Sequence, residues 1–141
     1  MIEFDSQNDF SLDLVDQTEN WIKATALKES YGIEMLGYVF CSDEYLLEIN
    51  EQFLKHDTYT DIVTFDYTEG KLLNGEMYIS TDRVAENADK FGVAFNTELR
   101  RVMIHGLLHM CGYGDKTDDE ISLMRNKEDY YLNLWNTADP S

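Results

Sequence analysis

The chain has 141 residues, 43% of them apolar, which predicts one globular domain, residues 1–141, with a sizeable core. No stretch approaches the roughly 18 apolar residues of a membrane span, and the N-terminal residues lack the basic and apolar segments of a secretory signal, so we expect a cytoplasmic protein without membrane contact. The net charge of −17, from 28 acidic and 11 basic side chains, opposes binding to a nucleic-acid backbone, because such binding normally uses Lys and Arg.

The N-terminal third predicts a strand, a helix and a second strand. Ile2 and Phe4 alternate with polar residues, as in a short strand. Residues 14–31 predict a helix that Gly32 would stop, and residues 34–41 predict a largely buried strand. The apolar side of the helix is expected to contain Leu14, Trp21, Ile22 and Ala26.

The middle of the chain predicts a second helix and a hairpin. Ser42 is placed to cap an amphipathic helix with i, i+3, i+4, i+7 spacing, carried by Leu46, Ile49, Asn50 and Phe53. Residues 61–67 are rich in β-branched and aromatic side chains and predict a strand. Asn74-Gly75 predicts a turn before a strand at 76–80, which would pair with the preceding one.

The C-terminal part predicts three helices. The first spans residues 82–91 and ends at Gly92, and the second spans 97–111 with Asn96 as its cap. Thr117 and Glu120 have the spacing of a capping box at the start of the last helix, whose core contacts are expected from Ile121, Met124, Tyr131, Leu132 and Trp135. The sequence therefore predicts an α+β fold, with one mixed sheet of about four strands and about five helices.

The segment HGLLHMCGYGD, residues 105–115, predicts a metal site at the end of a central helix. His105 and His109 are four apart, so both imidazoles lie on one helix face. Gly112 permits a left-handed turn that would bring Asp115 back toward them. Two His and one carboxylate form an ordinary catalytic zinc set with an open position. The alternative is that both are core histidines, hydrogen-bonded to their neighbours.

Three segments resemble the YbeY family. Residues 105–115 are similar to its motif H-G-x-L-H-x-x-G-Y-D-H. Residues 49–65, INEQFLKHDTYTDIVTF, resemble its L-N-x-x-Y-R-x-x-D-x-P-T-D-V-L-S-F, and residues 75–80, GEMYIS, resemble its G-(D/E)-I-x-I-S strand. The three segments occur in the same order and spacing as in the family.

The resemblance implies one zinc ion per chain, bound by three side chains, here His105, His109 and Asp115. It implies a single-strand-specific endoribonuclease acting in 16S rRNA 3′-end maturation and ribosome quality control. The expected partners are single-stranded RNA, rRNA and small-subunit ribosomal proteins, and no DNA substrate is expected. The resemblance leaves the general base, the attacking nucleophile and the cleavage site open.

The chain departs from the family motifs at four positions. Asp115 replaces the third histidine and Gly114 the residue before it, which can weaken zinc binding or favour harder ions such as manganese. Leu54 replaces an arginine, removing a plausible phosphate contact, and Tyr59 replaces a proline. Positive charge could come from the neighbouring residues Lys55 and His56.

Two other functions fit a zinc site. A zinc peptidase needs the pattern H-E-x-x-H with Glu as general base, but Gly106 occupies that position. A non-catalytic ribosome-assembly factor with a structural zinc would need a fourth ligand, such as Cys111 or a distant carboxylate. Arg101 shares the helix face of the histidines and is expected to form a salt bridge with Glu98.

Further side chains receive ordinary structural interpretations. Asp118 and Asp119 are expected to stabilise a helix N-terminus, and turn hydrogen bonds explain Asp57, Thr60 and Asp61. The resemblance nevertheless places this loop near the metal site.

Overall fold

The computed structural model describes residues 1–54 and 60–137, except for the side chains of Leu54 and Thr137. The elements are β1 (Ile2–Ser6), α1 (Val15–Lys28), β2 (Gly32–Cys41), α2 (Asp43–Leu54), β3 (Ile62–Asp66), β4 (Leu72–Ser80), α3 (Thr81–Phe91), α4 (Phe95–Met110) and α5 (Asp118–Thr137). Lys55, His56, Asp57 and Tyr59 lie outside the described residues.

The described strands form one mixed sheet in the order β1-β2-β4-β3. Strands β1, β2 and β4 are parallel neighbours, and β3 pairs antiparallel with β4. This arrangement confirms the predicted α+β class and the predicted hairpin. No described helix is long and apolar enough to cross a membrane.

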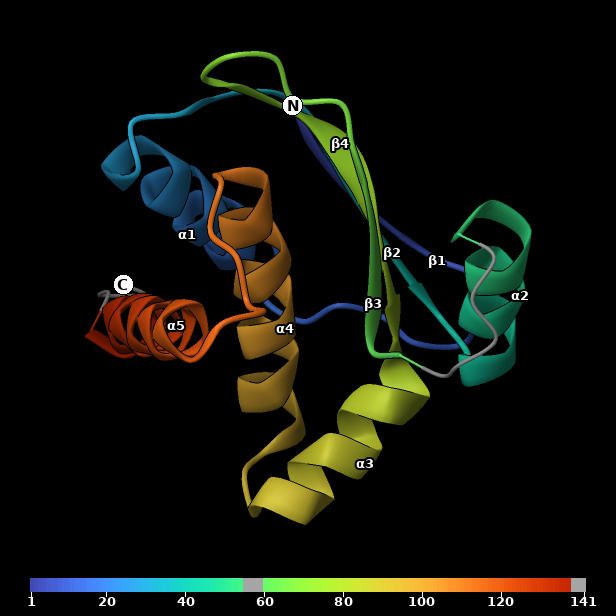
Figure 1. The fold of residues 1–141 in the computed structure, drawn as a ribbon. Coiled ribbons are helices and arrows are strands. Elements are labelled where there is room, and N and C mark those ends of the chain that lie inside the picture. Colours follow the sequence, from blue (N-terminus) through green and yellow to red (C-terminus); the bar gives the residue numbers. More distant parts are fainter. Residues whose placement is uncertain (55–59, 138–141) are drawn as a thin grey trace.

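The helices cover the sheet unequally. Helices α1, α4 and α5 lie on one side of it and α2 on the other, while α3 leads from the end of β4 to the start of α4 (Figure 1). The main core fills the space between the sheet and α1, α4 and α5, and its members include Ile22, Leu36, Tyr38, Ile79, Ile104 and Leu107. A smaller cluster lies under α2 and contains Cys41, Leu46, Ile49 and Val63.

Helix α4 is central because most of its circumference is apolar and buried. Its buried residues are Glu98, Leu99, Val102, Met103, Ile104, Gly106, Leu107, Leu108 and Met110. At Gly106 the helix approaches the sheet so closely that an added Cβ would lie 2.6 Å from Sδ of Met77 and 2.7 Å from Cδ1 of Ile62. Close packing at Gly106 therefore fixes how α4 is rotated against the sheet, and with it the direction of the helix face that carries the two histidines.

Two predicted caps are confirmed. The Ser42 hydroxyl accepts a hydrogen bond from the Tyr45 amide at 3.1 Å, at the start of α2. Thr117 Oγ1 accepts from the Glu120 amide at 3.1 Å, and the Glu120 carboxylate accepts from the Thr117 amide at 3.0 Å. This reciprocal pair is the predicted capping box of α5.

Two predicted turn and stop signals are wrong. Asn74 and Gly75 lie inside β4, and the hairpin instead turns around Gly70, which has φ 58°. Gly75 is required there by close packing, because an added Cβ would collide with the carbonyl of Phe65. Helix α1 ends at Lys28, before Gly32, and the chain reverses at Ser30 with φ 66°.

Three other local predictions are also wrong. Leu14 precedes α1 in a left-handed conformation and is exposed, so it does not join the apolar side. Asn96 lies inside α4, whose N-cap is Ala94. Ile121 is exposed and contributes to a cavity rather than to the core.

Candidate metal centre

The two histidines project from the C-terminal half of α4 toward one point. Their rings meet edge to face with centroids 4.5 Å apart. Gly112, with φ 99°, ends the helix in a left-handed turn, and the Tyr113 amide donates to the Leu108 carbonyl. This turn returns Asp115 to the histidine face, as the sequence predicted.

The three side chains present one atom each to a common centre. Nε2 of His109 lies 3.0 Å from Nε2 of His105 and 3.1 Å from Oδ2 of Asp115, and His105 Nε2 lies 3.5 Å from the same oxygen. Tetrahedral zinc, with ligands at roughly 2.0–2.2 Å, places its ligand atoms roughly 3.3–3.6 Å apart. The His105–Asp115 distance falls in this range and the other two distances are slightly shorter, so the group is compact enough to hold a metal ion.

Hydrogen bonds to the far side of each ring support the same conclusion. Nδ1 of His109 lies 2.8 Å from the Tyr113 carbonyl, which can only accept, so that nitrogen carries the hydrogen. Nδ1 of His105 lies 2.7 Å from Oε2 of Glu128. In neutral rings both Nε2 atoms then present lone pairs, beside the anionic Asp115. Three converging acceptors without a hydrogen between them favour a bound cation.

Glu128 is a site residue that the sequence interpretation missed. Its side chain is only 6% exposed, and Arg101 Nη1 donates to its second oxygen at 2.8 Å. Burial disfavours its charge, but the hydrogen bonds and charges of His105 and Arg101 outweigh burial and lower its pKa. One signal was available, because Glu128 lies four residues after Met124 and three before Tyr131, on the apolar stripe of α5.

Arg101 does not pair with Glu98, contrary to the sequence prediction. Its second guanidinium nitrogen donates to Asp129 at 2.7 Å, so both arms are used by α5. The prediction failed because Glu98, at i, i+3 spacing on the same helix, competes for the guanidinium with carboxylates of the packed neighbouring helix. Burial of Glu128 favours that second arrangement.

A second polar cluster holds the loop that follows α4. The Glu29 carboxylate accepts from the Tyr113 hydroxyl at 2.7 Å, from Lys127 at 3.3 Å and from the Tyr131 hydroxyl. Burial opposes ionisation of Glu29, but these three donors outweigh burial and lower its pKa. The cluster thus fixes Tyr113, whose carbonyl orients His109.

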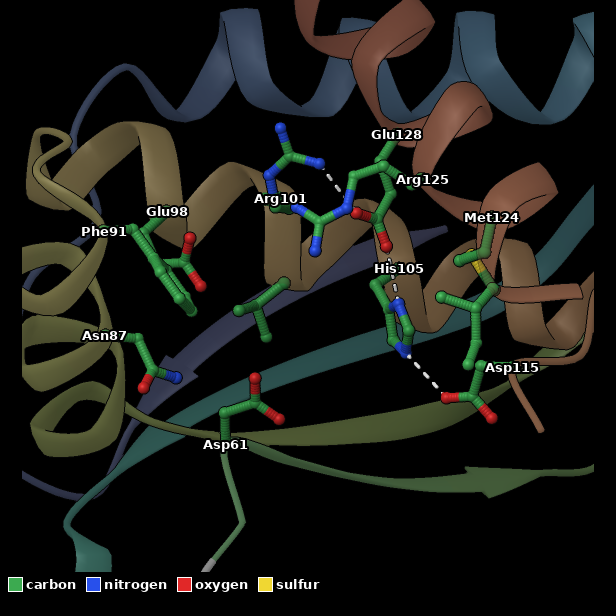
Figure 2. A pocket seen from close by; sticks show the side chains of 12 residues that line it. Asp61, Asn87, Phe91, Glu98, Arg101, His105, Asp115, Met124, Arg125 and Glu128 are labelled. Carbon is green, nitrogen blue, oxygen red and sulfur yellow. Dashed lines mark hydrogen bonds and ion pairs between the residues drawn. The ribbon is translucent and has the colours of Figure 1, made fainter. Parts of the chain in front are cut away.

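A cavity of about 330 Å³ opens beside the group. His105 and Asp115 lie at one end of it and Asn87 and Phe91 at the other, while Asp61 projects from the sheet side (Figure 2). Burial raises the pKa of Asp61, although the charge of His105 and backbone hydrogen bonds act against burial. The structure thus brings Asp61 to the site, as the resemblance implied.

The remaining predicted residues have structural surroundings. Cys111 packs against the main core, and burial raises the pKa of its thiol to about 12. Asp118 and Asp119 lie in the first turn of α5. Thr60 donates to the Ile62 carbonyl at 3.4 Å.

Comparisons with known proteins identify close similarities over nearly the whole chain. The family model described as Endoribonuclease YbeY matches residues 2–136. Endoribonuclease YbeY of Flavobacterium psychrophilum is 50% identical over 135 residues, 96% of each chain, and that of Christiangramia forsetii is 49% identical over 134 residues, 95% of this chain and 94% of the relative. A solution structure of TM1509 from Thermotoga maritima is 28% identical, with a TM-score of 0.70 over 100% of this chain and 99% of that one.

Proposed function

Because this chain belongs to the YbeY family of endoribonucleases, we propose that residues 1–141 form one zinc-dependent endoribonuclease domain that cleaves single-stranded RNA. Its proposed role is 16S rRNA 3′-end maturation and ribosome quality control in the cytoplasm. The observation that carries the metal dependence is the convergence of His105, His109 and Asp115.

The number of ligands favours a catalytic ion over a structural one. Closed structural zinc sites use four protein ligands, whereas catalytic sites use three and leave one position open. Within the described part of the chain, no fourth His, Cys, Asp or Glu joins the group. The proposal of a non-catalytic factor with a structural zinc is therefore less favoured.

Packing at Gly106 disfavours the peptidase alternative. Zinc peptidases carry a Glu beside the first metal-binding His. In this chain that position packs against Met77 and Ile62, which leaves no room even for a Cβ. The general base of a peptidase could not be accommodated there without displacing the side chains of Met77 and Ile62.

When bound, zinc would polarise a phosphoryl oxygen and lower the pKa of a water molecule toward about 7. The protein's own contribution is to orient the ligands. Glu128 holds the ring of His105, and the Tyr113 carbonyl holds that of His109. Whether water or the ribose 2′-hydroxyl attacks would follow from the product, since a cyclic phosphate indicates the hydroxyl.

Chelation tests this proposal. The purified protein should cleave unstructured RNA faster than duplex RNA, 1,10-phenanthroline should stop the reaction, and added zinc should restore it. Casein should remain intact. Cleavage of RNA that persists in metal-free protein, prepared free of contaminating nuclease, would refute the proposal.

The charge of the chain bears on its partners. With a net charge of −17, long-range electrostatics opposes RNA encounter, and Leu54 replaces the arginine of the family motif. We therefore expect weak, salt-dependent RNA binding by the isolated protein, and delivery by a basic small-subunit ribosomal protein. Filter binding of unstructured RNA at two salt concentrations tests this, and sub-micromolar affinity at physiological salt without a partner would contradict it.

A further inference from the structure

A buried carboxylate without a partner lies in the wall of the cavity. Glu98 is only 5% exposed, yet its side chain makes no hydrogen bond or ion pair with any described residue. Its oxygens face the cavity (Figure 2). Burial raises the pKa of this carboxyl, and the charge of nearby Arg101 offsets only part of that effect. Buried polar groups normally have partners, so Glu98 presents an unused acceptor pair.

Arg101 and the metal group do not use this carboxylate. Both guanidinium arms of Arg101 are bound to Glu128 and Asp129. The group that can hold a metal ion, in the described residues, does not include Glu98. The carboxylate is therefore available to a ligand that enters the cavity.

Helix α3 contributes two further groups to the same end of the cavity. The Asn87 amide is half-buried and has no side-chain hydrogen bond within residues 1–54 and 60–137. The Phe91 ring is 58% exposed. Asn87, Phe91 and Glu98 lie together at the end opposite Asp115 (Figure 2). The combination is a carboxylate, an amide and an aromatic face.

We propose that Glu98, Asn87 and Phe91 form a subsite for an unpaired guanine base of the RNA substrate. This inference rests on the proposed nuclease function. The cavity volume of about 330 Å³ lies at the small end of the range for ligand pockets and suits one nucleotide. Recognition of single-stranded RNA commonly combines aromatic stacking with hydrogen bonds to the Watson–Crick edge.

The Glu98 carboxylate favours guanine because of the hydrogen-bond donors of that base. Its N1–H and N2–H₂ groups are adjacent donors, which match the two oxygens of the Glu98 carboxylate. Adenine and cytosine present one amino donor beside a ring-nitrogen acceptor, and uracil presents one N–H between two carbonyls. Each of these would direct a lone pair at the carboxylate. The Asn87 amide can donate to O6 of guanine, and Phe91 can stack on the ring.

The charges around the cavity suit a nucleotide once a divalent ion is bound. Four carboxylates line it, those of Asp61, Glu98, Asp115 and Glu128, together with the guanidinium groups of Arg101 and Arg125. The formal sum of −4 and +2 is −2, which a divalent cation would cancel. Arg125 is exposed and forms no ion pair with a described residue, so it can meet a phosphate. In the proposed binding mode, the base contacts Glu98 and the phosphate lies on the side of His105.

Nucleotide binding tests the subsite directly. The zinc-loaded full chain is titrated with GMP, AMP, CMP and UMP, whose common phosphate makes differences report the base. GMP should bind roughly tenfold more tightly than AMP, CMP and UMP, since a good bidentate contact supplies discrimination of that order. Glu98→Gln should abolish this preference, because an amide offers only one acceptor. Glu51→Gln, which removes the same charge from the exposed surface of α2, should keep it.

Two further variants keep the test decisive. Phe91→Leu should weaken all four nucleotides about equally, and Asn87→Ala should reduce the guanine preference. A loss of zinc or a lowered thermal midpoint would show that Glu98→Gln is misfolded. In that case, the guanine preference of Asn87→Ala decides whether the subsite exists. Equal binding of the four nucleotides by the native protein, or a preference that survives in Glu98→Gln, would overturn the subsite.

Cleavage measured in parallel separates this inference from the proposed function. RNA cleavage without any guanine preference in nucleotide binding overturns the subsite alone. A guanine preference in a protein that cleaves no RNA overturns the nuclease function alone.

Discussion

Oε2 of Glu128 lies 2.7 Å from Nδ1 of His105, so a buried carboxylate of α5 orients a proposed metal ligand on α4 across 23 residues of sequence. Glu128→Gln should weaken zinc binding by about 10- to 100-fold, the usual cost of losing such an outer partner. Competition with a colorimetric zinc chelator measures this. Asp129→Asn removes a charge that is 52% exposed and whose one ion pair with a described residue is to Arg101. The zinc affinity of this variant should therefore stay near the native value. Equal affinities of Glu128→Gln and the native protein would contradict the proposed role.

The loop anchor at Glu29 predicts a pH-dependent contribution to stability. Its lowered pKa means that the folded protein releases this proton more readily than the unfolded chain. The contribution is therefore complete above the ordinary value near 4.5 and is lost as pH falls through the lower folded-state value.

Glu29→Gln should destabilise the metal-free protein by about 1–3 kcal/mol at pH 7, and by less at pH 3.5. Urea denaturation in the presence of chelator at both pH values checks this. Glu3→Gln, on the exposed side of β1, should show little change at either. A Glu29→Gln deficit that grows on acidification would show that the sign is wrong.

Close packing at Gly106 predicts that a single methyl group is harmful. Gly106→Ala places a Cβ against the buried Met77 and against Ile62, so it should lower the free energy of unfolding by about 1–3 kcal/mol. At a solvent-exposed position of a helix, the same change from Gly to Ala would stabilise the protein. Gly37→Ala serves as the control, because its Cβ would meet only Cγ of Glu76 at 3.5 Å. Chemical denaturation should separate the two variants clearly.

Asp115 predicts an altered metal preference. Imidazole suits zinc, whereas carboxylates also suit manganese, so Asp115→His should raise the ratio of zinc affinity to manganese affinity. Asp115→Ala should weaken both ions. Calorimetric titration of the metal-free variants measures the ratios. An unchanged ratio in Asp115→His would indicate that this side chain is not a ligand.

Local patterns predicted most of the fold. Hydrophobic periodicity located the strands and helices, and the capping motifs at Ser42 and Thr117 located two helix starts. The errors occurred where tertiary contacts override local preference. Gly75 resembles a turn residue, but it is needed inside β4 because the backbone of Phe65 passes too close for a side chain.

The sequence predicted those parts of the site whose residues are close together in the chain. His105, His109 and Asp115 lie within one helix turn and one loop, so the sequence placed them together. Glu128, Glu29 and Glu98 gain their roles from helix packing. The spacing of Glu128 on the apolar stripe of α5 indicates that it is buried, but the spacing of residues does not encode the partners of these three side chains. The partner of Arg101 was wrong for this reason, because α5 offers two carboxylates that its own helix neighbour cannot match.

The most direct test of a zinc-dependent nuclease is to measure zinc content and RNA cleavage on the same preparations of native protein and His109→Ala. The native protein should contain about one zinc per chain and cleave unstructured RNA. His109→Ala should lose most of its zinc, as expected when one of three ligands is removed, and should lose cleavage in parallel. Full zinc occupancy and undiminished cleavage in His109→Ala would contradict the assignment of this centre.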